Sequence, residues 1–283
     1  MSAKPVEHLN GIRPLAERYD VFLLDQFGVL HDGTSPYPGA VEALSALKRA
    51  GKTIVLISNS GKRAGPNESR LLKLGFEPRS WDHFVSSGEV AWELFHDMAA
   101  AGRLLPNTKC LLISRDDDRS AIEGLPFALT KDGDDAGLVL ISASEGDRYD
   151  LDHYRRLLAP AAARQVACFC TNPDKIMLTT VGPRFGAGQL ADLYENLGGS
   201  VTRIGKPYPA IFDTALALVG NPHRSTVVCV GDSVEHDIAG GLAAGVSTVL
   251  VQSGILADTA DLIDLFDTMD AYPDYTMDRF RYC

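Results

Sequence analysis

The 283-residue sequence predicts an α/β protein with a parallel sheet covered by helices on both faces. Two observations point to this fold class: short apolar or β-branched runs alternate with amphipathic stretches along almost the whole chain, and the loops between them are short. The composition agrees, because hydrophobic residues make up 45% and charged residues 23% of the chain. These values are ordinary for a globular protein and exclude a disordered, collagen-like or coiled-coil chain.

The N-terminal part of the chain begins the sheet. Residues 19–24 (YDVFLL) form a compact apolar run that ends at a charge, which is typical of a buried parallel strand. Apolar residues then recur with helical spacing from 40 to 50, and a glycine follows. Residues 52–57 (KTIVLI) predict a second strand, and 68–74 predict a second helix before another glycine.

The C-terminal part repeats this order. Strands are predicted at 225–230 and 247–251, on either side of an Ala/Gly-rich helix at 238–244. The tail, residues 269–283, is aromatic and could pack on the core or on a partner; we expect it to pack on the core of its own chain.

The middle of the chain is predicted to form a second α/β unit. Its expected elements are strands at 109–113, 137–142 and 165–170 and a helix at 152–163. Two acidic loops, 116–118 and 132–135, interrupt it; they could chelate a cation, but solvated turns are the simpler interpretation. The sequence therefore predicts a core of 1–83 plus 184–283, with a smaller domain inserted at 84–183.

Charge and cysteine content restrict the classes of partner and the compartment. The net charge of −10 and the pI near 5.1 argue against a broad nucleic-acid or anionic-membrane surface. No run of 18 apolar residues predicts a membrane span, and the N-terminal twenty residues have no apolar signal region.

Five cysteines are an odd number, so free thiols in the cytoplasm are expected. Cys168 and Cys170 could suggest a metal, but buried small side chains on a strand are preferred.

Polar residues follow the first two predicted strands at the point where each ends. Asp25 follows the first strand, and such a carboxylate can be a nucleophile, a metal ligand or a helix cap. Ser58 closes the second strand, and hydroxyl and backbone N–H groups there suit phosphate oxygens, although Ser-Asn-Ser-Gly is also an ordinary turn. Ligands in open α/β sheets bind outside the carboxyl ends of strands, so these positions are candidates for a site.

Two later clusters have the same placement. Lys206 stands between Gly and Pro after a short apolar run, which holds it more stiffly than an ordinary surface lysine, although a solvated lysine is the alternative. Asp232 ends a strand, and Asp237 lies five residues further on at the opening of a helix. Two converging carboxylates suit Mg²⁺, whereas a lone aspartate there would be a helix cap.

In this order the four clusters resemble the motifs of the haloacid dehalogenase superfamily: an aspartate loop, a Ser/Thr, a Lys and an acidic pair. The resemblance is strongest to subclass IIA, which includes p-nitrophenyl, nucleotide and pyridoxal phosphatases. GVLHDG followed by Pro38-Gly39-Ala40, the SNS after the second strand, and the Thr171–Asp174 stretch (TNPD) support this subclass. The resemblance implies a Rossmann-like parallel-sheet core with an inserted α/β cap of the C2 type that selects the substrate.

The resemblance also implies the chemistry. It is that of a Mg²⁺-dependent phosphatase of a small phosphorylated metabolite, such as a sugar phosphate, a nucleotide or a pyridoxal or pyridoxine phosphate, through an aspartyl-phosphate on Asp25. Lys206 would balance the charge of the nucleophile and the phosphoryl group. Caps of this subclass often form homodimers. The implied substrate-binding residues are Ser58, Asn59, Ser60, Asn172 and Asp174, and the implied metal ligands are Asp25, the backbone carbonyl of Phe27, Asp232 and Asp237, the last directly or through water.

One position departs from the family pattern. The general acid–base aspartate, two residues after the nucleophile, is Phe27 here. Phenylalanine cannot transfer a proton, and such help is typically worth about 10²–10⁴-fold in rate. We expect Phe27 to fill an apolar niche beside the sheet. His31 and Asp32, just beyond it, are candidates for a substitute acid, but a simple loop role is the more economical interpretation.

Three interpretations stay open at this point. The first is a slow or specialised phosphatase. The second is another reaction, such as dehalogenation, which the retained Asp232 and Asp237 disfavour because that reaction needs no Mg²⁺. The third is a catalytically weak or silent protein that binds a phosphate ligand.

Overall fold

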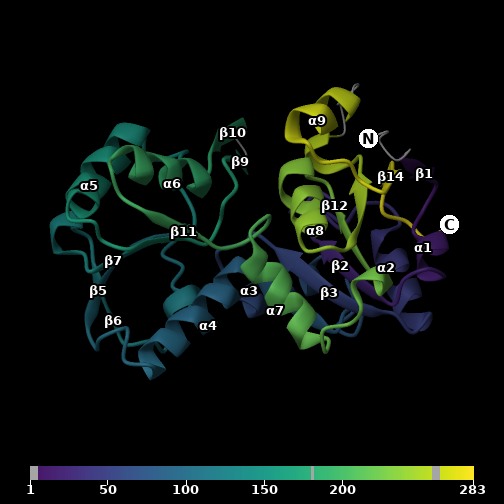
Figure 1. Ribbon diagram of the computed structural model, residues 1–283, viewed down its shortest axis with the longest axis horizontal. Coiled ribbons are helices and arrows are strands. Elements are labelled where there is room, and N and C mark those ends of the chain that lie inside the picture. The colour runs from purple at the N-terminus through teal and green to yellow at the C-terminus, as the bar shows by residue number, and fades with distance from the viewer. Residues whose placement is uncertain (1–5, 180–181, 257–261) are drawn as a thin grey trace. The chain divides into compact units, whose positions relative to one another are not determined.

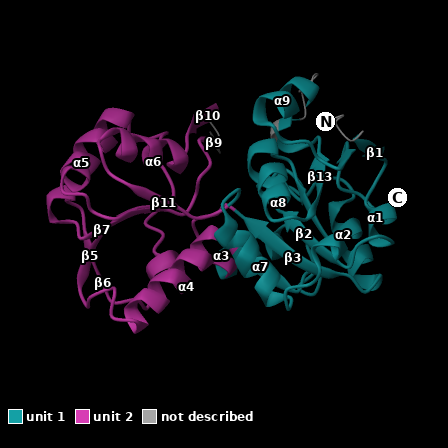
Figure 2. Cartoon of the chain, in the orientation of Figure 1, with its two compact units in different colours: residues 1–58, 65–85, 206–283 teal, residues 59–64, 86–205 magenta. Residues whose placement is uncertain are grey.

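A computed structural model describes residues 6–179, 182–256 and 262–283 and divides the chain into two compact units (Figures 1 and 2). Unit 1 comprises Met1–Ser58, Gly65–Val85 and Lys206–Cys283, and unit 2 comprises Asn59–Ala64 and Ser86–Gly205. Each unit contains a parallel sheet with helices packed against it, so the predicted α/β fold class is confirmed.

Unit 1 is built on a seven-stranded sheet with the order β1-β14-β13-β12-β2-β3-β4. The pairings that join β1 through to β3 in this order are all parallel. Every residue of the central strands β2 and β12 is buried, as expected for strands covered on both faces. The strands are β1 (Glu7–Leu9), β2 (Val21–Asp25), β3 (Thr53–Ser58), β4 (His83–Ser86), β12 (Val227–Gly231), β13 (Ser247–Val251) and β14 (Tyr275–Met277).

Amphipathic helices flank this sheet, with α2, α7 and α8 lying beside its strands in Figure 1. The α2 helix shows why these helices pack on the sheet. Its apolar residues Ala40, Ala43, Leu44 and Leu47 share one face and are fully buried. The helix predicted at 238–244 is preceded by a turn of π-helix, η4. The helices of unit 1 are α1 (Arg13–Ala16), α2 (Ala40–Arg49), α3 (Ala64–Lys73), α7 (Pro209–Leu218), η3 (Arg224–Thr226), η4 (Val234–Ile238), α8 (Ala239–Ala243), η5 (Gly254–Leu256) and α9 (Leu262–Met269).

The aromatic C-terminal tail is part of the unit 1 sheet. Its strand β14 lies between β13 and β1, and it pairs with both in parallel. Met277 and Phe280 are fully buried, which confirms that the tail packs on the core of its own chain.

Unit 2 contains a parallel sheet with the order β11-β8-β7-β5-β6 and a separate antiparallel hairpin of β9 and β10. Helices α5 and α6 pack together against the sheet and bury Tyr154, Leu158, Leu190 and Tyr194. The elements are α4 (Ser87–Ala100), β5 (Thr108–Ile113), η1 (Ser120–Ile122), β6 (Phe127–Thr130), η2 (Gly133–Asp135), β7 (Leu138–Ile141), α5 (Leu151–Ala163), β8 (Cys168–Cys170), β9 (Ile176–Thr179), β10 (Gly182–Phe185), α6 (Ala187–Asn196) and β11 (Val201–Arg203).

The boundaries of unit 2 differ from the expected insert of 84–183. Unit 2 runs on to Gly205, because β11 pairs with β8 and α6 packs into the same hydrophobic cluster. The core predicted from the sequence includes these elements, because sequence periodicity does not say which sheet a strand joins. Unit 2 also includes 59–64, where the Arg63 guanidinium donates hydrogen bonds from two of its nitrogens to the Glu89 carboxylate.

The cysteine pair and the two acidic loops, which the sequence also offered as possible metal ligands, have structural roles. Cys168 and Cys170 are buried on β8, as the preferred interpretation expected. In the acidic loops, Asp118 accepts hydrogen bonds from Ser120, and Asp132 accepts one from the backbone N–H of Asp134. Across the described part of the chain, no helix combines the length and the apolar character needed to cross a membrane.

Candidate active site

The carboxyl ends of three neighbouring strands carry the predicted site residues of unit 1. Asp25 is the last residue of β2, Ser58 is the last residue of β3, and Asp232 follows the last residue of β12. The sheet order places β2 between β12 and β3, so these ends lie side by side. Lys206 and Asp237 also belong to unit 1.

Lys206 links two of the predicted carboxylates. Its Nζ lies 2.7 Å from Oδ1 of Asp25 and 2.7 Å from Oδ1 of Asp237. Its side chain is only 3% exposed, so the solvated alternative for this lysine is wrong. Although burial alone lowers the pKa of Lys206, the charges of Asp237 and Asp25 raise it above its ordinary value, so the ammonium stays charged.

Asp25, Asp232 and Asp237 form a compact carboxylate cluster. One oxygen from each lies within 4.8 Å of the others, and within the described residues this is the only group of three His, Cys, Asp or Glu with such geometry. Three carboxylates and one ammonium give the cluster a formal charge of −2. Burial raises the pKa of Asp25 to about 7; Lys206 opposes the increase and Asp237 adds to it. The donor set is therefore all oxygen and electron-rich, which fits a hard divalent cation.

The carboxylate of Asp232 lies in a cradle that only glycine allows. A Cβ on Gly28 would lie 1.9 Å from Oδ2 of Asp232, and one on Gly254 would lie 2.0 Å from the same oxygen. Both glycines also have positive φ angles, 89° and 61°, which favour glycine independently. The backbone is thus shaped around this carboxylate.

Asp237 is anchored through both of its oxygens. Oδ1 receives the hydrogen bond from Lys206, and Oδ2 accepts one from the backbone N–H of Ser233 at 3.1 Å. The π-helical turn η4 carries this aspartate and leaves its side chain 1% exposed. Asp237 consequently holds the Lys206 ammonium and the loop after β12 in place through hydrogen bonds.

Sequence reasoning missed Gln26. This residue is 3% exposed, and its Nε2 donates a 2.8 Å hydrogen bond to Oγ of Ser58. Its backbone N–H also donates to the Asp25 carboxylate. The signal available in the sequence was an amide side chain between Asp25 and Phe27, directly after a strand whose other residues are apolar.

Phe27 does not fill a buried niche, so that expectation is wrong. Its side chain is 38% exposed, and the backbone forms a bridge to His31. The ring meets the imidazole of His31 edge-on, with centroids 5.6 Å apart, and covers Gly33. The backbone turns at Gly28, which has a positive φ of 89°, and Phe27, two residues after Asp25, is at the surface.

His31 and Asp32 both have structural hydrogen bonds in this loop. His31 is fully buried, and burial followed by the charge of Arg70 lowers its pKa to about 4, so it is neutral at pH 7. Asp32 accepts hydrogen bonds from Thr34 and from the backbone N–H of Ser35, which lower its pKa to about 2. A carboxylate with so low a pKa is a poor proton donor at neutral pH, and the loop role is the one the geometry favours.

The remaining predicted substrate-binding residues belong to unit 2, and three of them, Asn59, Asn172 and Asp174, are joined by hydrogen bonds there. Asn59 donates from Nδ2 to Oδ1 of Asp174 at 2.8 Å, and Oδ1 of Asn172 accepts from the backbone N–H of Asp174 at 3.1 Å. Oγ of Ser60 accepts from the backbone N–H of Lys62. Their role toward a substrate stays a prediction.

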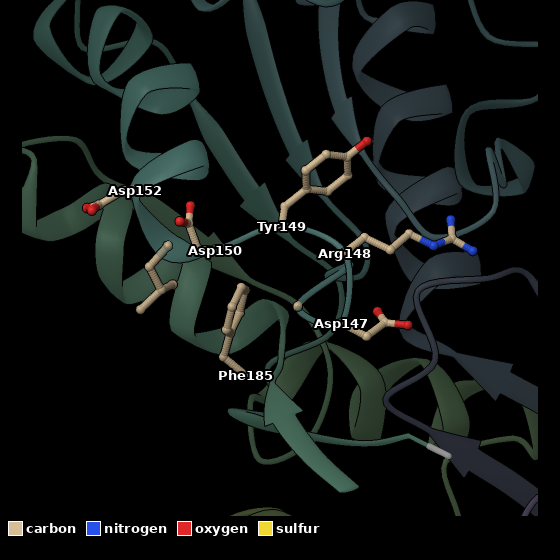
Figure 3. A pocket seen from close by; sticks show the side chains of 8 residues that line it. Asp147, Arg148, Tyr149, Asp150, Asp152 and Phe185 are labelled. Atoms are coloured by element: carbon tan, nitrogen blue, oxygen red, sulfur yellow. The ribbon is translucent and has the colours of Figure 1, made fainter. Parts of the chain in front are cut away.

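Unit 2 also has an open surface pocket of about 510 Å³, formed by residues 146–152 and Phe185 (Figure 3). The charged residues Asp147 and Arg148 on its lining are already paired, with Arg115 and Glu145 respectively. None of the predicted site residues lines this pocket.

Comparison with known proteins gives the family. The profile described as haloacid dehalogenase-like hydrolase matches residues 22–128, and a second haloacid dehalogenase-type hydrolase profile matches 203–281. Human chronophin is 31% identical over 276 residues, which cover 88% of this chain and 87% of chronophin. The chain belongs to the haloacid dehalogenase-like hydrolases, in the subclass IIA that its motifs resemble.

Further similarities agree with this subclass. A D-glycerol 3-phosphate phosphatase from Mycobacterium tuberculosis is 28% identical over 248 residues, which cover 86% of this chain and 66% of that protein. A haloacid dehalogenase-like hydrolase from Brucella suis has a TM-score of 0.83 at 25% identity and covers 96% of this chain and 99% of its own. The p-nitrophenyl phosphatase from Archaeoglobus fulgidus has a TM-score of 0.71 at 26% identity, with 92% and 96% covered.

Proposed function

We propose that this protein is a Mg²⁺-dependent phosphatase of small phosphomonoesters that acts through an aspartyl-phosphate. Its family makes it a phosphoric monoester hydrolase, and the relatives named above include phosphatases of glycerol phosphate and p-nitrophenyl phosphate. The observation that carries the proposal is the buried cluster in which Lys206 links Asp25 to Asp237 beside Asp232.

The chain's own residues fit a magnesium ion. Asp25, Asp232 and the backbone carbonyl of Phe27 would hold it, and Asp237, whose oxygens already bind Lys206 and Ser233, would act through a water. When bound, Mg²⁺ supplies positive charge that offsets the buried carboxylates and the phosphoryl oxygens. The cradle formed around Asp232 and the convergence of three carboxylates are the structural support for this site.

Asp25 is the proposed nucleophile. An anionic carboxylate that approaches an anionic phosphate is repelled by about 4 kcal/mol at 4 Å in an effective dielectric constant near 20. Lys206, 2.7 Å from Asp25, is placed to offset part of this repulsion and to hold the carboxylate in one orientation. Ser58, at the end of the adjacent strand, would donate its hydroxyl to a phosphoryl oxygen. Phosphoryl transfer depends mainly on this positioning and charge balance.

Phe27 favours a second candidate function, a catalytically weak or silent protein that binds a phosphate ligand. Neither of the two candidate acids, His31 and Asp32, is suited to donate a proton, since His31 is buried and neutral and Asp32 is ionised. The two functions differ in turnover but share the metal and phosphate contacts.

The deciding experiment is the hydrolysis of p-nitrophenyl phosphate with and without Mg²⁺. Its leaving group needs little protonation, so a phosphatase that lacks the acid should still turn over. Asp25→Asn should reduce turnover by about 10³-fold or more, whereas the matched control Asp20→Asn, at an exposed carboxylate, should keep wild-type activity. Activity that persists in Asp25→Asn would overturn the proposal. No turnover, together with Mg²⁺-dependent thermal stabilisation by phosphate esters, would support the silent binder.

The metal assignment has its own test. Asp232→Ala should abolish Mg²⁺ binding in calorimetry and the Mg²⁺ dependence of any activity or ligand binding. Unchanged Mg²⁺ affinity in this variant would refute Asp232 as a ligand. Turnover measured side by side on glycerol phosphate, nucleoside monophosphates, sugar phosphates and pyridoxal phosphate would then identify the class of substrate.

A further inference from the structure

A buried chain of hydrogen bonds leads from the backbone of the loop after β2 to the hydroxyl of Ser58. Its three side chains are those of His31, Gln26 and Ser58, which are 0%, 3% and 5% exposed. All three belong to unit 1, and the proposed phosphatase mechanism assigns no role to Gln26 or His31.

The first link determines the tautomer of His31. The backbone N–H of Gly33 donates to Nδ1 of His31 at 2.9 Å, so Nδ1 must be an unprotonated acceptor. The ring is then neutral and carries its proton on Nε2. That nitrogen lies 3.4 Å from Oε1 of Gln26, and it can only be the donor in this contact.

The second link determines the orientation of the Gln26 amide. With Oε1 accepting from His31, the NH₂ group faces Ser58 and donates to its Oγ at 2.8 Å. The opposite amide orientation would place the amide oxygen against Ser58 and two N–H groups against each other at His31. A buried donor without a partner costs about 1–3 kcal/mol, so this orientation is disfavoured.

The third link concerns the hydroxyl proton of Ser58. Because the serine oxygen accepts the hydrogen bond from Gln26, its own proton must point away from Gln26. Ser58 ends β3, and the preceding residue Ile57 is in register with Asp25 on β2. The hydroxyl is therefore oriented as a donor next to the strand end that carries the nucleophile.

We propose that Gln26, itself held by His31, is a positioning residue that presents the Ser58 hydroxyl as a hydrogen-bond donor to a phosphoryl oxygen. This inference rests on the proposed function, because it needs a phosphate group at Ser58. A merely structural role for the same network would stabilise the loop, and phosphate affinity would then not depend on Gln26 through the Ser58 hydroxyl.

A double-mutant cycle separates the two roles. The probe is inorganic phosphate, titrated into the full chain with saturating Mg²⁺ by calorimetry. Gln26→Leu should weaken phosphate binding about tenfold, and Ser58→Ala by a similar factor. In the Ser58→Ala background, Gln26→Leu should change the affinity less than about twofold, since the hydroxyl through which it acts is gone.

Two further variants accompany the cycle, one as a control and one as a substitute for Gln26→Leu. Asn67→Leu, at a 1% exposed amide on α3 of the same unit, is the matched control and should change stability without changing phosphate affinity. If Gln26→Leu does not fold, Gln26→Met keeps a longer unbranched side chain without the N–H donor and should give the same tenfold loss.

The outcomes distinguish this inference from the proposed function. Suppose that the wild type turns over and binds phosphate. Unchanged phosphate affinity in Gln26→Leu would then overturn the positioning role and leave the phosphatase proposal intact. Losses of affinity that multiply in the double variant would do the same. A wild-type protein that neither hydrolyses p-nitrophenyl phosphate nor binds phosphate would overturn both. Equal losses in the two single variants and no further loss in the double variant support the positioning role.

Discussion

The ammonium nitrogen of Lys206 lies 2.7 Å from Oδ1 of Asp25, and the lysine side chain is 3% and the aspartate side chain 10% exposed. The same nitrogen is 2.7 Å from Asp237, so one buried cation holds two buried carboxylates. A buried charge that loses its partner is strongly destabilising, because neither water nor another group replaces it. We therefore expect this pair to contribute to the stability of the fold.

Lys206→Met should therefore lower the free energy of unfolding by about 3–5 kcal/mol in a metal chelator. Added Mg²⁺ should restore part of this loss, because a divalent cation would neutralise the same carboxylates. Urea unfolding with EDTA and with Mg²⁺ measures both effects. Lys52→Met is the control, since Lys52 pairs with an Asp20 side chain that is 74% exposed, and it should cost less than about 1 kcal/mol. Equal costs for the two variants would contradict this account of the pair.

Phe27→Asp should restore a carboxylate at the general acid–base position. Because Phe27 is 38% exposed, the variant should fold with little loss of stability. Turnover should rise most for alkyl phosphates, whose leaving oxygen builds up negative charge that a nearby acid can neutralise. The measurement is the dependence of kcat/KM on leaving-group pKa across a series of phosphate esters.

The control for that series is Phe27→Asn, which has nearly the same shape as the aspartate variant but no proton to give. It should show the leaving-group dependence of the wild type. An Asp variant with a wild-type dependence would mean that another group already supplies the proton.

The buried His31 makes stability depend on pH. Its pKa in the folded chain is about 4, below the ordinary value near 6.5, so the unfolded chain binds the proton first as the pH falls. The stabilising contribution is complete above pH 6.5 and is lost progressively as the pH drops from 6.5 to 4, by up to about 3 kcal/mol. Urea unfolding of wild type at several pH values should show this decline. His31→Gln should be less stable at pH 7.5 but should lose less stability than wild type down to pH 4; parallel declines would contradict the assignment.

The five cysteines should differ sharply in reactivity. Cys110, Cys168, Cys170 and Cys229 are buried, and burial raises the pKa of each thiol, to about 12 for Cys110 and Cys170. The thiolate is the reactive form, so these four should be inert in the folded chain. A disulfide reagent should modify one thiol rapidly, the exposed Cys283, and all five in denaturant. Cys283→Ser should abolish the rapid phase, and two or more rapid thiols in the wild type would contradict this burial pattern.

The sequence alone determined the α/β class and the placement of the main site residues. Strand and helix periods are local properties, so the strand that ends at Asp25 and the one that ends at Ser58 could be recognised within one or two residues of their ends. In a parallel sheet those ends share one edge, and the structure places Asp25, Asp232 and Asp237 within 4.8 Å of one another. The motif order that resembles the haloacid dehalogenase superfamily then predicted the family.

Tertiary structure decided which partners each element and side chain takes. The pairing of β11 with β8 extends unit 2 to Gly205, and β14 inserts between β13 and β1; both are contacts between distant segments that no local period encodes. The same reason applies to Gln26, whose partner Ser58 lies 32 residues away on the next strand. Burial of a polar side chain requires a hydrogen-bond partner, and the identity of that partner depends on how the chain folds in space rather than on its sequence neighbours.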